Sequence, residues 1–169
     1  MSTSSLTWTE GTTKVAGLDL HIVKGGSGDP LLVLHDEMGQ TAPLRYAEEL
    51  ARDFTLHMPA HPGFGITERL DWIMTMRDLA GWYLRALEEL RLERVNVLGF
   101  SLGGWLAAEM ACQSPQAFGK MALVAPAGIK PPTGEILDMF LIVAKEYLEV
   151  SFLDPNSTLE YPIICPEEA

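Results

Sequence analysis

A serine framed by glycines, Gly99-Phe100-Ser101-Leu102-Gly103-Gly104, is the stretch of the sequence best suited to chemistry. It fits the pattern G-x-S-x-G, follows a short apolar run at 95–98 and opens into an apolar, helix-like run at 105–111. A strand, a sharp turn at the serine and a helix make a nucleophile elbow, which presents the serine hydroxyl at the end of a sheet. Glycines suit the crowded, strained backbone of such a turn. The pattern therefore predicts a nucleophile at Ser101.

The residue after the serine adds a second element to this chemistry. Leu102 would lie at the N-terminus of the helix, where backbone N–H groups lack intrahelical partners and the helix dipole is positive. Such N–H groups stabilise a developing oxyanion. The alternative is that Ser101 is an ordinary N-cap serine on a glycine-rich turn, and the preceding strand makes this the weaker interpretation.

The chain around this turn alternates between strands and helices. Short apolar runs typical of buried strands are separated by stretches typical of helices, after a hairpin that turns at Ala16-Gly17. The expected strands are 6–13, 18–24, 31–34, 54–58, 95–98 and 121–125, and the expected helices are 41–52, 75–90 and 103–114. This order predicts an α/β fold with a mostly parallel sheet and helices on both faces. Ligands of such sheets bind beyond the carboxyl ends of the strands.

The expected helices carry signals at their ends and on their faces. Thr41 is placed to cap the first, and Thr75 and Asp78 form a capping-box pair at the second. The third is apolar almost all round, so we expect it to be buried and Cys112 to be a buried thiol. The acidic residues Glu88, Glu89 and Glu93 are most simply a solvated face.

The character of the chain changes after residue 125. We divide it into a core at 1–128 and a second part at 129–169, which opens with a proline-rich linker and holds a helix candidate at 136–152. Methionine and aromatic side chains recur on one face of this helix; they could line an apolar pocket, and simple packing on the core explains them at least as well. No element is predicted over 153–169.

The balance of charge excludes some partners. The 169 residues include 12 Lys and Arg against 23 Asp and Glu, a net charge of −11, so neither nucleic acid nor an anionic membrane is an expected partner. No run is long and apolar enough to span a membrane, and the first residues do not resemble a secretory leader, so we expect a cytoplasmic protein. The two cysteines, Cys112 and Cys165, lack the spacing of metal ligands, and no metal is expected.

Three segments together resemble the α/β-hydrolase superfamily, over about Leu18 to Gly128. They are the turn at Ser101, the loop Pro62-Gly63-Phe64-Gly65, and His35 at the start of the loop after strand 31–34. The resemblance implies the fold already expected from the alternation of elements, with a helical cap that begins at 129–152. It also implies a serine nucleophile and a reaction that needs no cofactor.

The same resemblance implies where the substrate would bind. The oxyanion hole would be formed by the N–H of Leu102 and of a residue in the 36–38 loop, most simply Glu37. Residues next to these donors would contact the substrate, namely His35, Asp36, Met38 and Phe100. The expected partner is a small ester-like molecule.

Two features depart from the family pattern. The family usually has glycine after the loop histidine, whereas this chain has Asp36, which tolerates some unusual backbone dihedrals better than most residues. The family triad runs serine, acid, histidine, but all four histidines of this chain, His21, His35, His57 and His61, precede Ser101. The chain lacks the catalytic acid and histidine in that order, and it resembles the amino-terminal part of a hydrolase, truncated in the cap.

Other residues offer weaker substitutes for the missing groups. His61 could approach the site as a surrogate base, but a polar turn residue is the stronger interpretation. His35 is better explained as a structural residue that closes the oxyanion loop. Asp138 and Asp154 are the later candidates for an acid, and both are more simply solvated surface residues.

Two functional hypotheses follow. The first is a serine hydrolase that acts on a small ester or related acyl substrate through an acyl-enzyme. The elbow alone does not distinguish ester hydrolysis from acyl transfer or C–C cleavage. The second is a catalytically incomplete fragment or a non-enzymatic binding domain on the same scaffold, which the missing histidine favours. We also expect strand 121–125 to be an open edge and the sheet face near helix 41–52 to be uncovered, so that the chain self-associates.

Overall fold

The computed structural model describes residues 7–39, 43–136, 138 and 141. The chain divides into two compact units, Met1–Ile129 and Lys130–Ala169, and the fold below is that of the first. The helix expected at 136–152 falls largely outside the described residues. Among the residues that are described, no helix is both long and apolar enough to cross a membrane.

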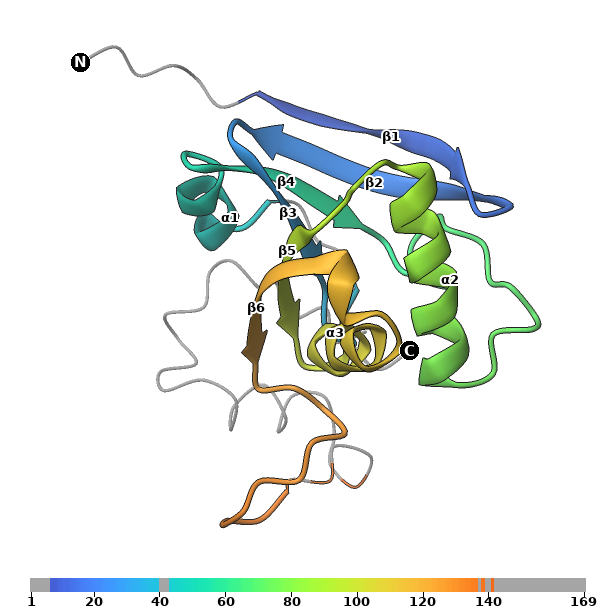
Figure 1. The fold of residues 1–169 in the computed structure, drawn as a ribbon, viewed down its shortest axis with the longest axis vertical. Coiled ribbons are helices and arrows are strands. Elements are labelled where there is room, and N and C mark those ends of the chain that lie inside the picture. The colour runs from blue at the N-terminus through green and yellow to red at the C-terminus, as the bar shows by residue number, and fades with distance from the viewer. Residues whose placement is uncertain (1–6, 40–42, 137, 139–140, 142–169) are drawn as a thin grey trace, which may run out of the picture. The chain divides into compact units, whose positions relative to one another are not determined.

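The described chain forms one mixed sheet in the order β1-β2-β4-β3-β5-β6 (Figure 1). The strands are β1 (Trp8–Val15), β2 (Leu18–Gly26), β3 (Asp29–Leu34), β4 (Phe54–Pro59), β5 (Val95–Phe100) and β6 (Phe118–Val124). The pairs β1–β2 and β2–β4 are antiparallel, whereas β4–β3, β3–β5 and β5–β6 are parallel. The expected α/β fold with a mostly parallel sheet is confirmed. Within the described residues β1 and β6 are its two edge strands, and an edge at β6 was expected.

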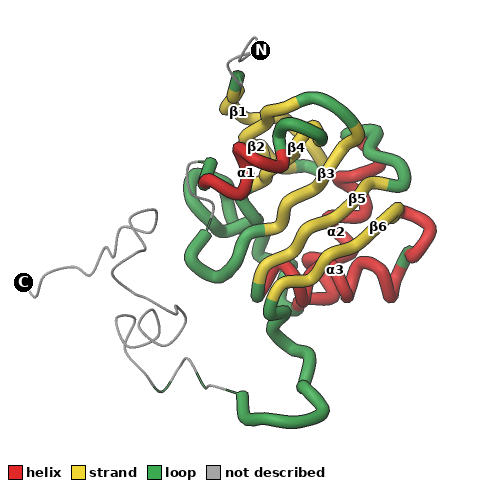
Figure 2. Tube along the Cα trace, turned by 90° about the vertical axis from the view of Figure 1, so that its left-hand side faces the viewer, coloured by secondary structure: helices red, strands yellow, loops and turns green. Residues whose placement is uncertain are grey.

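Helices cover both faces of the sheet, also as expected. The helices are α1 (Arg45–Leu50), α2 (Met76–Glu89) and α3 (Leu102–Gln113), with a 3-10 turn at Pro115–Ala117. Figure 2 shows α2 and α3 on one side of the strands and α1 on the other. Strand β3 is buried on both faces because its side chains alternate: Leu32 and Leu34 join the core under α2 and α3, and Leu31 and Val33 join the core under α1.

Local signals explain α2 best. Thr75 is its N-cap and forms the expected capping box with Asp78, and its apolar stripe is buried in the larger core. The expectation for α1 is partly wrong, because this helix begins at Arg45 with Leu44 as a cap that makes no side-chain hydrogen bond. Thr41, the expected cap, lies outside the described residues.

Helix α3 buries one face rather than its whole circumference. Its buried residues are Gly103, Gly104, Leu106, Ala107 and Met110. Cys112 lies on the opposite side and is exposed, so the expectation of a buried thiol is wrong. Burial cannot be inferred from the apolar composition of a helix alone, because a residue near its end is exposed where no other element packs on that side.

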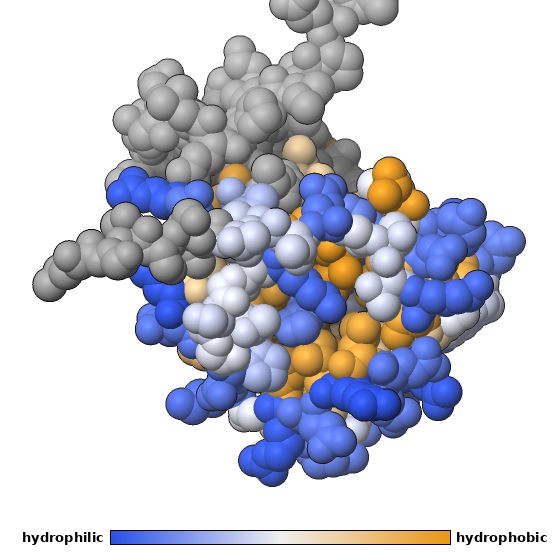
Figure 3. Space-filling model, turned by 90° about the horizontal axis from the view of Figure 1, so that it is seen from above, coloured by the Kyte–Doolittle hydropathy of each residue, from blue (hydrophilic) through white to orange (hydrophobic). Residues whose placement is uncertain are grey.

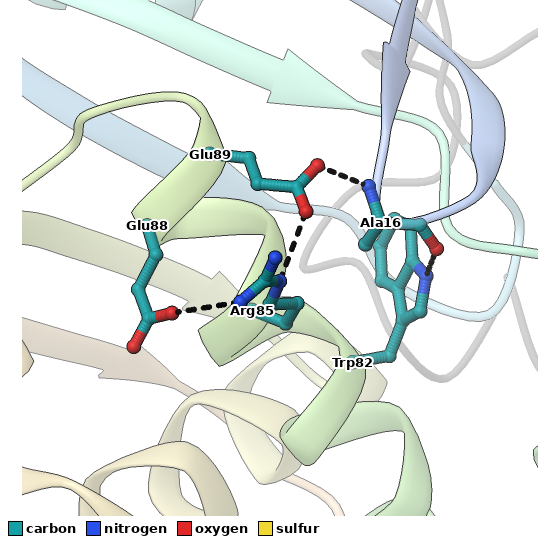
Figure 4. A network of polar contacts seen from close by, with 5 residues as sticks. All are labelled: Ala16, Trp82, Arg85, Glu88 and Glu89. Atoms are coloured by element: carbon teal, nitrogen blue, oxygen red, sulfur yellow. Dashed lines mark hydrogen bonds and ion pairs between the residues drawn. The ribbon is translucent and has the colours of Figure 1, made fainter.

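A polar network joins α2 to the hairpin turn (Figure 4). The indole Nε1 of Trp82 donates to the carbonyl oxygen of Ala16 at 3.1 Å, and the N–H of Ala16 donates to Glu89 at 2.7 Å. Glu89 also accepts from Arg85 at 2.9 Å. Glu89 is therefore more than part of a solvated face, because it holds the turn at Ala16, where the backbone has φ 48°.

The α1 face of the sheet retains a groove in the described structure. This cavity of about 560 Å³ is lined by residues from β3, β5, β6 and the end of α1, among them Leu31, Leu98 and Met121. Another side of the molecule, seen from the direction of β1, has apolar side chains gathered in a patch with hydrophilic residues around it (Figure 3). An uncovered sheet face near α1 was expected, and the groove lies on that face. The self-association inferred from an uncovered face stays a prediction.

Candidate active site

Ser101 lies at the junction of β5 and α3 with an unusual backbone. Its dihedrals are φ 43° and ψ −107°, outside the regions that L-residues favour. It occupies the N-cap position of α3, yet its side chain makes no capping hydrogen bond. An outlier of this kind costs about 1–3 kcal/mol and persists only where its surroundings impose it. The sharp turn predicted from the G-x-S-x-G pattern is therefore present, and simple helix capping does not explain the serine.

Three glycines make this turn sterically feasible. A Cβ on Gly99 would lie 2.5 Å from the carbonyl oxygen of Gly103, and a Cβ on Gly103 would lie 2.2 Å from that of Leu34. A Cβ on Gly104 would lie 2.9 Å from Pro126. Because two of the clashing atoms belong to the backbone, α3 starts against the ends of β5 and β3 only if glycine occupies these positions.

Backbone hydrogen bonds hold Ser101 from both sides. Its N–H donates to the carbonyl oxygen of Val124 at 3.0 Å, and its own carbonyl accepts from Trp105 and Ala127, each at 3.0 Å. Ala125, beside these partners, also has a positive φ of 43°. The strained conformation of Ser101 is thus fixed by β6, by the loop after it and by the first turn of α3.

The loop after β3 lies next to this turn and folds around Asp36. The carboxylate of Asp36 accepts from the N–H of Met38 at 2.9 Å, and its carbonyl accepts from Gly39 at 3.3 Å. Asp36 itself does not have a positive φ, so the residue that replaces the family's glycine needs no left-handed backbone here. The N–H groups of Met38 and Gly39 are both used within the loop, which disfavours either as an oxyanion donor.

The Asp36 carboxyl also changes the electrostatics of the loop. Burial raises its pKa above the usual value, the N–H of Met38 opposes this shift, and the charge of Glu37 adds to it. A carboxylate here places negative charge beside the proposed oxyanion donors. Asp36 therefore weakens the local preference for an anion when it is ionised.

His35, which is half-buried, and His61, which is buried, pack together behind this loop. Their ring centroids are 3.7 Å apart, and Phe64, carried between two glycines of positive φ, packs edge-on against both rings. The N–H of His61 donates to Nε2 of His35 at 3.0 Å, and Nδ1 of His35 lies 2.6 Å from the carbonyl oxygen of Asp36. His35 is thus a neutral imidazole protonated on Nδ1, because Nε2 must accept.

Tyr83 completes this arrangement from α2. Nε2 of His61 lies 3.2 Å from the carbonyl oxygen of His35, so this nitrogen must donate. Nδ1 of His61 then accepts from the Tyr83 hydroxyl, 2.6 Å away. Burial lowers the pKa of both histidines and raises that of Tyr83, so all three are neutral near pH 7.

His61 differs from what the sequence suggested. Its carbonyl accepts from the N–H of Phe64 at 2.8 Å, so it is a turn residue as interpreted, but its side chain is completely buried rather than solvated. Both its ring nitrogens are occupied, by Tyr83 and by the carbonyl of His35, and this geometry offers no lone pair for a surrogate base. His35 closes the loop structurally, as the sequence indicated. Tyr83 lies among the buried apolar residues of α2, and the sequence gives no local signal for the partner of its hydroxyl.

The remaining predicted residues are spread around the elbow. The ring of Phe100 packs on Tyr46 of α1, with centroids 5.0 Å apart, and Met38 is 52% exposed on the loop after β3. Asp154 lies outside the described residues. Within the described ranges, no three His, Cys, Asp or Glu side chains cluster in a way that could hold a metal ion.

Comparison with known proteins identifies similar chains. The sequence model of the alpha/beta hydrolase fold family matches residues 25–150. The chain is 31% identical over 130 residues to a 2-hydroxymuconate semialdehyde hydrolase of Pseudomonas sp. (strain CF600), covering 73% of this chain and 45% of that protein. It is 27% identical over 155 residues to a pimeloyl-[acyl-carrier protein] methyl ester esterase of Vibrio parahaemolyticus, covering 82% of this chain and 59% of that protein.

A solved structure has the same fold. The 2-hydroxy-6-oxo-6-phenylhexa-2,4-dienoate hydrolase of Rhodococcus sp. strain RHA1 aligns with a TM-score of 0.60 at 23% identity, covering 76% of this chain and 51% of that chain. The chain thus spans 45–59% of the length of these three proteins.

Proposed function

The chain belongs to the alpha/beta hydrolase family, and we propose that Ser101 is the nucleophile of a serine hydrolase that acts on an ester or related acyl substrate. The observation that carries the proposal is the backbone of Ser101, held at φ 43° and ψ −107° between β5 and the N-terminus of α3. Strain of this kind is kept where a side chain must be presented in one direction. The hydroxyl makes no capping bond that would otherwise explain it.

In the proposed reaction, the Ser101 oxygen attacks the substrate carbonyl carbon. The carbonyl oxygen becomes an oxyanion, stabilised by the N–H groups of Leu102 and Glu37. The leaving group departs to give an acyl-enzyme, and water then hydrolyses the ester bond to Ser101. No step needs a metal or an organic cofactor.

The proposed mechanism also needs a base that removes the proton from the Ser101 hydroxyl. A serine hydroxyl is a weak nucleophile without one, and no histidine follows Ser101 in the sequence. His61 is occupied by Tyr83 and His35. In the proposed mechanism the base therefore comes from outside the described residues.

The substrate class rests on the relatives. One is named for a methyl ester and another for a semialdehyde. A carbonyl carbon beside the bond to be cleaved is common to ester hydrolysis and to C–C hydrolysis by attack of a nucleophile. We therefore propose a small carbonyl substrate without choosing between these two bonds.

A second candidate is a binding domain without catalysis on the same scaffold. One observation favours it, namely that the two ring nitrogens of His61 are already bound. Such a protein would keep the elbow and the loop as a site for a carbonyl or carboxylate ligand.

A fluorophosphonate probe tests the proposal on the full 169-residue chain. We expect stoichiometric labelling that is lost in Ser101→Ala and kept in Ser114→Ala, a matched serine at the other end of α3. Circular dichroism establishes that each sample is folded. Folded wild-type chain that takes up no probe would overturn the hydrolase proposal for this chain and favour the binding domain.

A further inference from the structure

We propose that Tyr83 is a positioning residue that acts through His61 and His35 to set the direction of the Glu37 N–H in the loop after β3. The proposal rests on the proposed function, in which this N–H is one of the oxyanion donors. Tyr83 would not touch the substrate. Its role would be to orient a donor through two imidazoles.

The first step of the argument is the chain of hydrogen bonds. The Tyr83 hydroxyl donates to Nδ1 of His61 at 2.6 Å, and Nε2 of His61 donates to the carbonyl oxygen of His35 at 3.2 Å. A phenol in this position can donate to Nδ1, which fixes the His61 proton on Nε2. Without the phenol, either tautomer of His61 becomes accessible, and one of them has no hydrogen to offer to His35.

The second step is the peptide plane between residues 36 and 37. Nδ1 of His35 donates to the carbonyl oxygen of Asp36 at 2.6 Å. This carbonyl and the Glu37 N–H belong to one trans peptide unit, in which they point in opposite directions. A bond that holds the carbonyl of Asp36 therefore also aims the N–H of Glu37.

The third step links the preceding peptide, between residues 35 and 36, to the elbow. A Cβ on Gly103 would lie 2.6 Å from the carbonyl oxygen of His35, so the first turn of α3 packs on the same peptide group that His61 holds. The carbonyl of His35 is therefore confined between α3 and the ring of His61. Tyr83, on α2, thereby fixes the loop relative to the turn that carries Ser101.

Burial makes the relay effective. Tyr83 is 1% exposed and His61 is completely buried, so water does not compete for these bonds. Removing the hydroxyl leaves a buried acceptor without its donor, which costs more than the hydrogen bond itself contributes. The cheapest response is a tautomer change or a ring rotation in His61, and either change releases the loop.

The test compares Tyr83→Phe with Trp82→Phe in the full chain. Phenylalanine at position 83 removes only the hydroxyl. The neighbouring Trp82 donates to the hairpin turn at Ala16 and packs edge-on against the Tyr83 ring, with centroids 5.0 Å apart, so Trp82→Phe changes the packing beside Tyr83 while leaving its hydroxyl in place. Nitrogen-15 NMR reports the tautomers of both histidines and the shift and hydrogen exchange of the Glu37 amide. The rate of fluorophosphonate labelling at Ser101 is measured in parallel.

We expect Tyr83→Phe to move the His61 tautomer and the Glu37 amide, and Trp82→Phe to leave both as in the wild type. Complete loss of one oxyanion-hole donor costs about 10²–10³-fold in rate, so a misdirected donor should slow labelling by roughly tenfold. Tyr83→Phe that is less stable but has an unchanged Glu37 amide would overturn the proposal, since that is the result of a merely structural tyrosine.

Failure of the proposed function and failure of the role of Tyr83 give different results. If the wild type is folded but takes up no probe, the proposed function fails, while the NMR comparison still decides whether Tyr83 sets the Glu37 amide. If Tyr83→Phe does not fold, His61→Gln replaces it, because glutamine removes the ring and its tautomers. We expect the same change at Glu37, and an unchanged amide in that variant would overturn the proposal.

Discussion

His35 and His61 bind each other twice, each time between a backbone group of one and a ring nitrogen of the other. The ring Nε2 of His61 lies 3.2 Å from the carbonyl oxygen of His35, and the N–H of His61 lies 3.0 Å from Nε2 of His35. The two bonds fix the distance between the loop after β3 and the loop after β4. The bond from the His61 N–H requires a neutral His35, because Nε2 must accept, so the contact depends on pH.

The first prediction is that acid destabilises the fold through histidine. His57 on β4 has its pKa lowered to about 4 from 6.5 by burial and by the charge of Lys24. The unfolded chain takes up a proton near pH 6.5 that the folded chain refuses, so stability is lost as pH falls from 6.5 toward 4. His35 and His61 act in the same direction.

Urea unfolding of the wild type and His57→Gln, between pH 7.5 and 4.5, measures this effect. We expect a shallower loss of stability in the variant, and also in Lys24→Gln, which removes the opposing charge. Asp36 acts in the opposite sense, because its pKa is raised, but it is common to all three proteins. If stability falls with pH at the same rate in the wild type and in His57→Gln, His57 has the same pKa in the folded and the unfolded chain, and the prediction is wrong.

The second prediction concerns the strain at Ser101. Glycine has no Cβ and adopts a positive φ readily, whereas alanine keeps the strain of an L-residue. We therefore expect Ser101→Gly to be more stable than Ser101→Ala by about 1 kcal/mol, which is the lower end of the cost of such an outlier. Denaturant titration of the two variants measures the difference. Equal stability would mean that the backbone relaxes to an ordinary conformation without the serine.

Much of the fold was predictable from local patterns. Continuous apolar runs such as Leu31–Leu34 indicated strands buried on both faces, and the pair Thr75 and Asp78 marked the start of α2. These signals lie within a few residues of each other. The glycines around Ser101 were predictable for the same reason, since the turn that needs them is formed by adjacent residues.

Contacts between distant residues were not predictable in this way. The Tyr83–His61 bond spans 22 residues and the Ala16–Glu89 bond spans 73, and neither leaves a periodic mark in the sequence. Tyr83 fits an apolar stripe equally well with or without a partner for its hydroxyl. Cys112 was placed wrongly for a related reason, because exposure depends on which elements pack against a helix.

The third prediction is that Glu89 stabilises the hairpin turn. Its carboxylate accepts from the N–H of Ala16 at 2.7 Å and from Arg85 at 2.9 Å, whereas Glu88 lies 3.7 Å from Arg85 and is not bonded to the hairpin (Figure 4). We expect Glu89→Ala to lower the unfolding midpoint more than the matched Glu88→Ala. Hydrogen exchange should also be faster at Ala16 in Glu89→Ala alone. Equal effects of the two variants would mean that Glu89 contributes only as a charge on the surface of α2 and does not stabilise the hairpin turn.

The fourth prediction tests the contact between α3 and the end of β3. A Cβ on Gly103 would lie 2.2 Å from the carbonyl oxygen of Leu34, and neither backbone can move without shifting the start of α3 or the loop after β3. We expect Gly103→Ala to cost about 3 kcal/mol, the upper part of the range for overpacking. Gly11→Ala is the control, because a Cβ there meets no atom within 4 Å, and alanine in a strand is neutral or stabilising by up to about 1 kcal/mol. Denaturant titration measures both, and the Glu37 amide shift reports whether the loop moves. A Gly103→Ala protein as stable as the wild type would mean that α3 does not start against β3, and the alignment of Ser101 with the loop would then lose its structural basis.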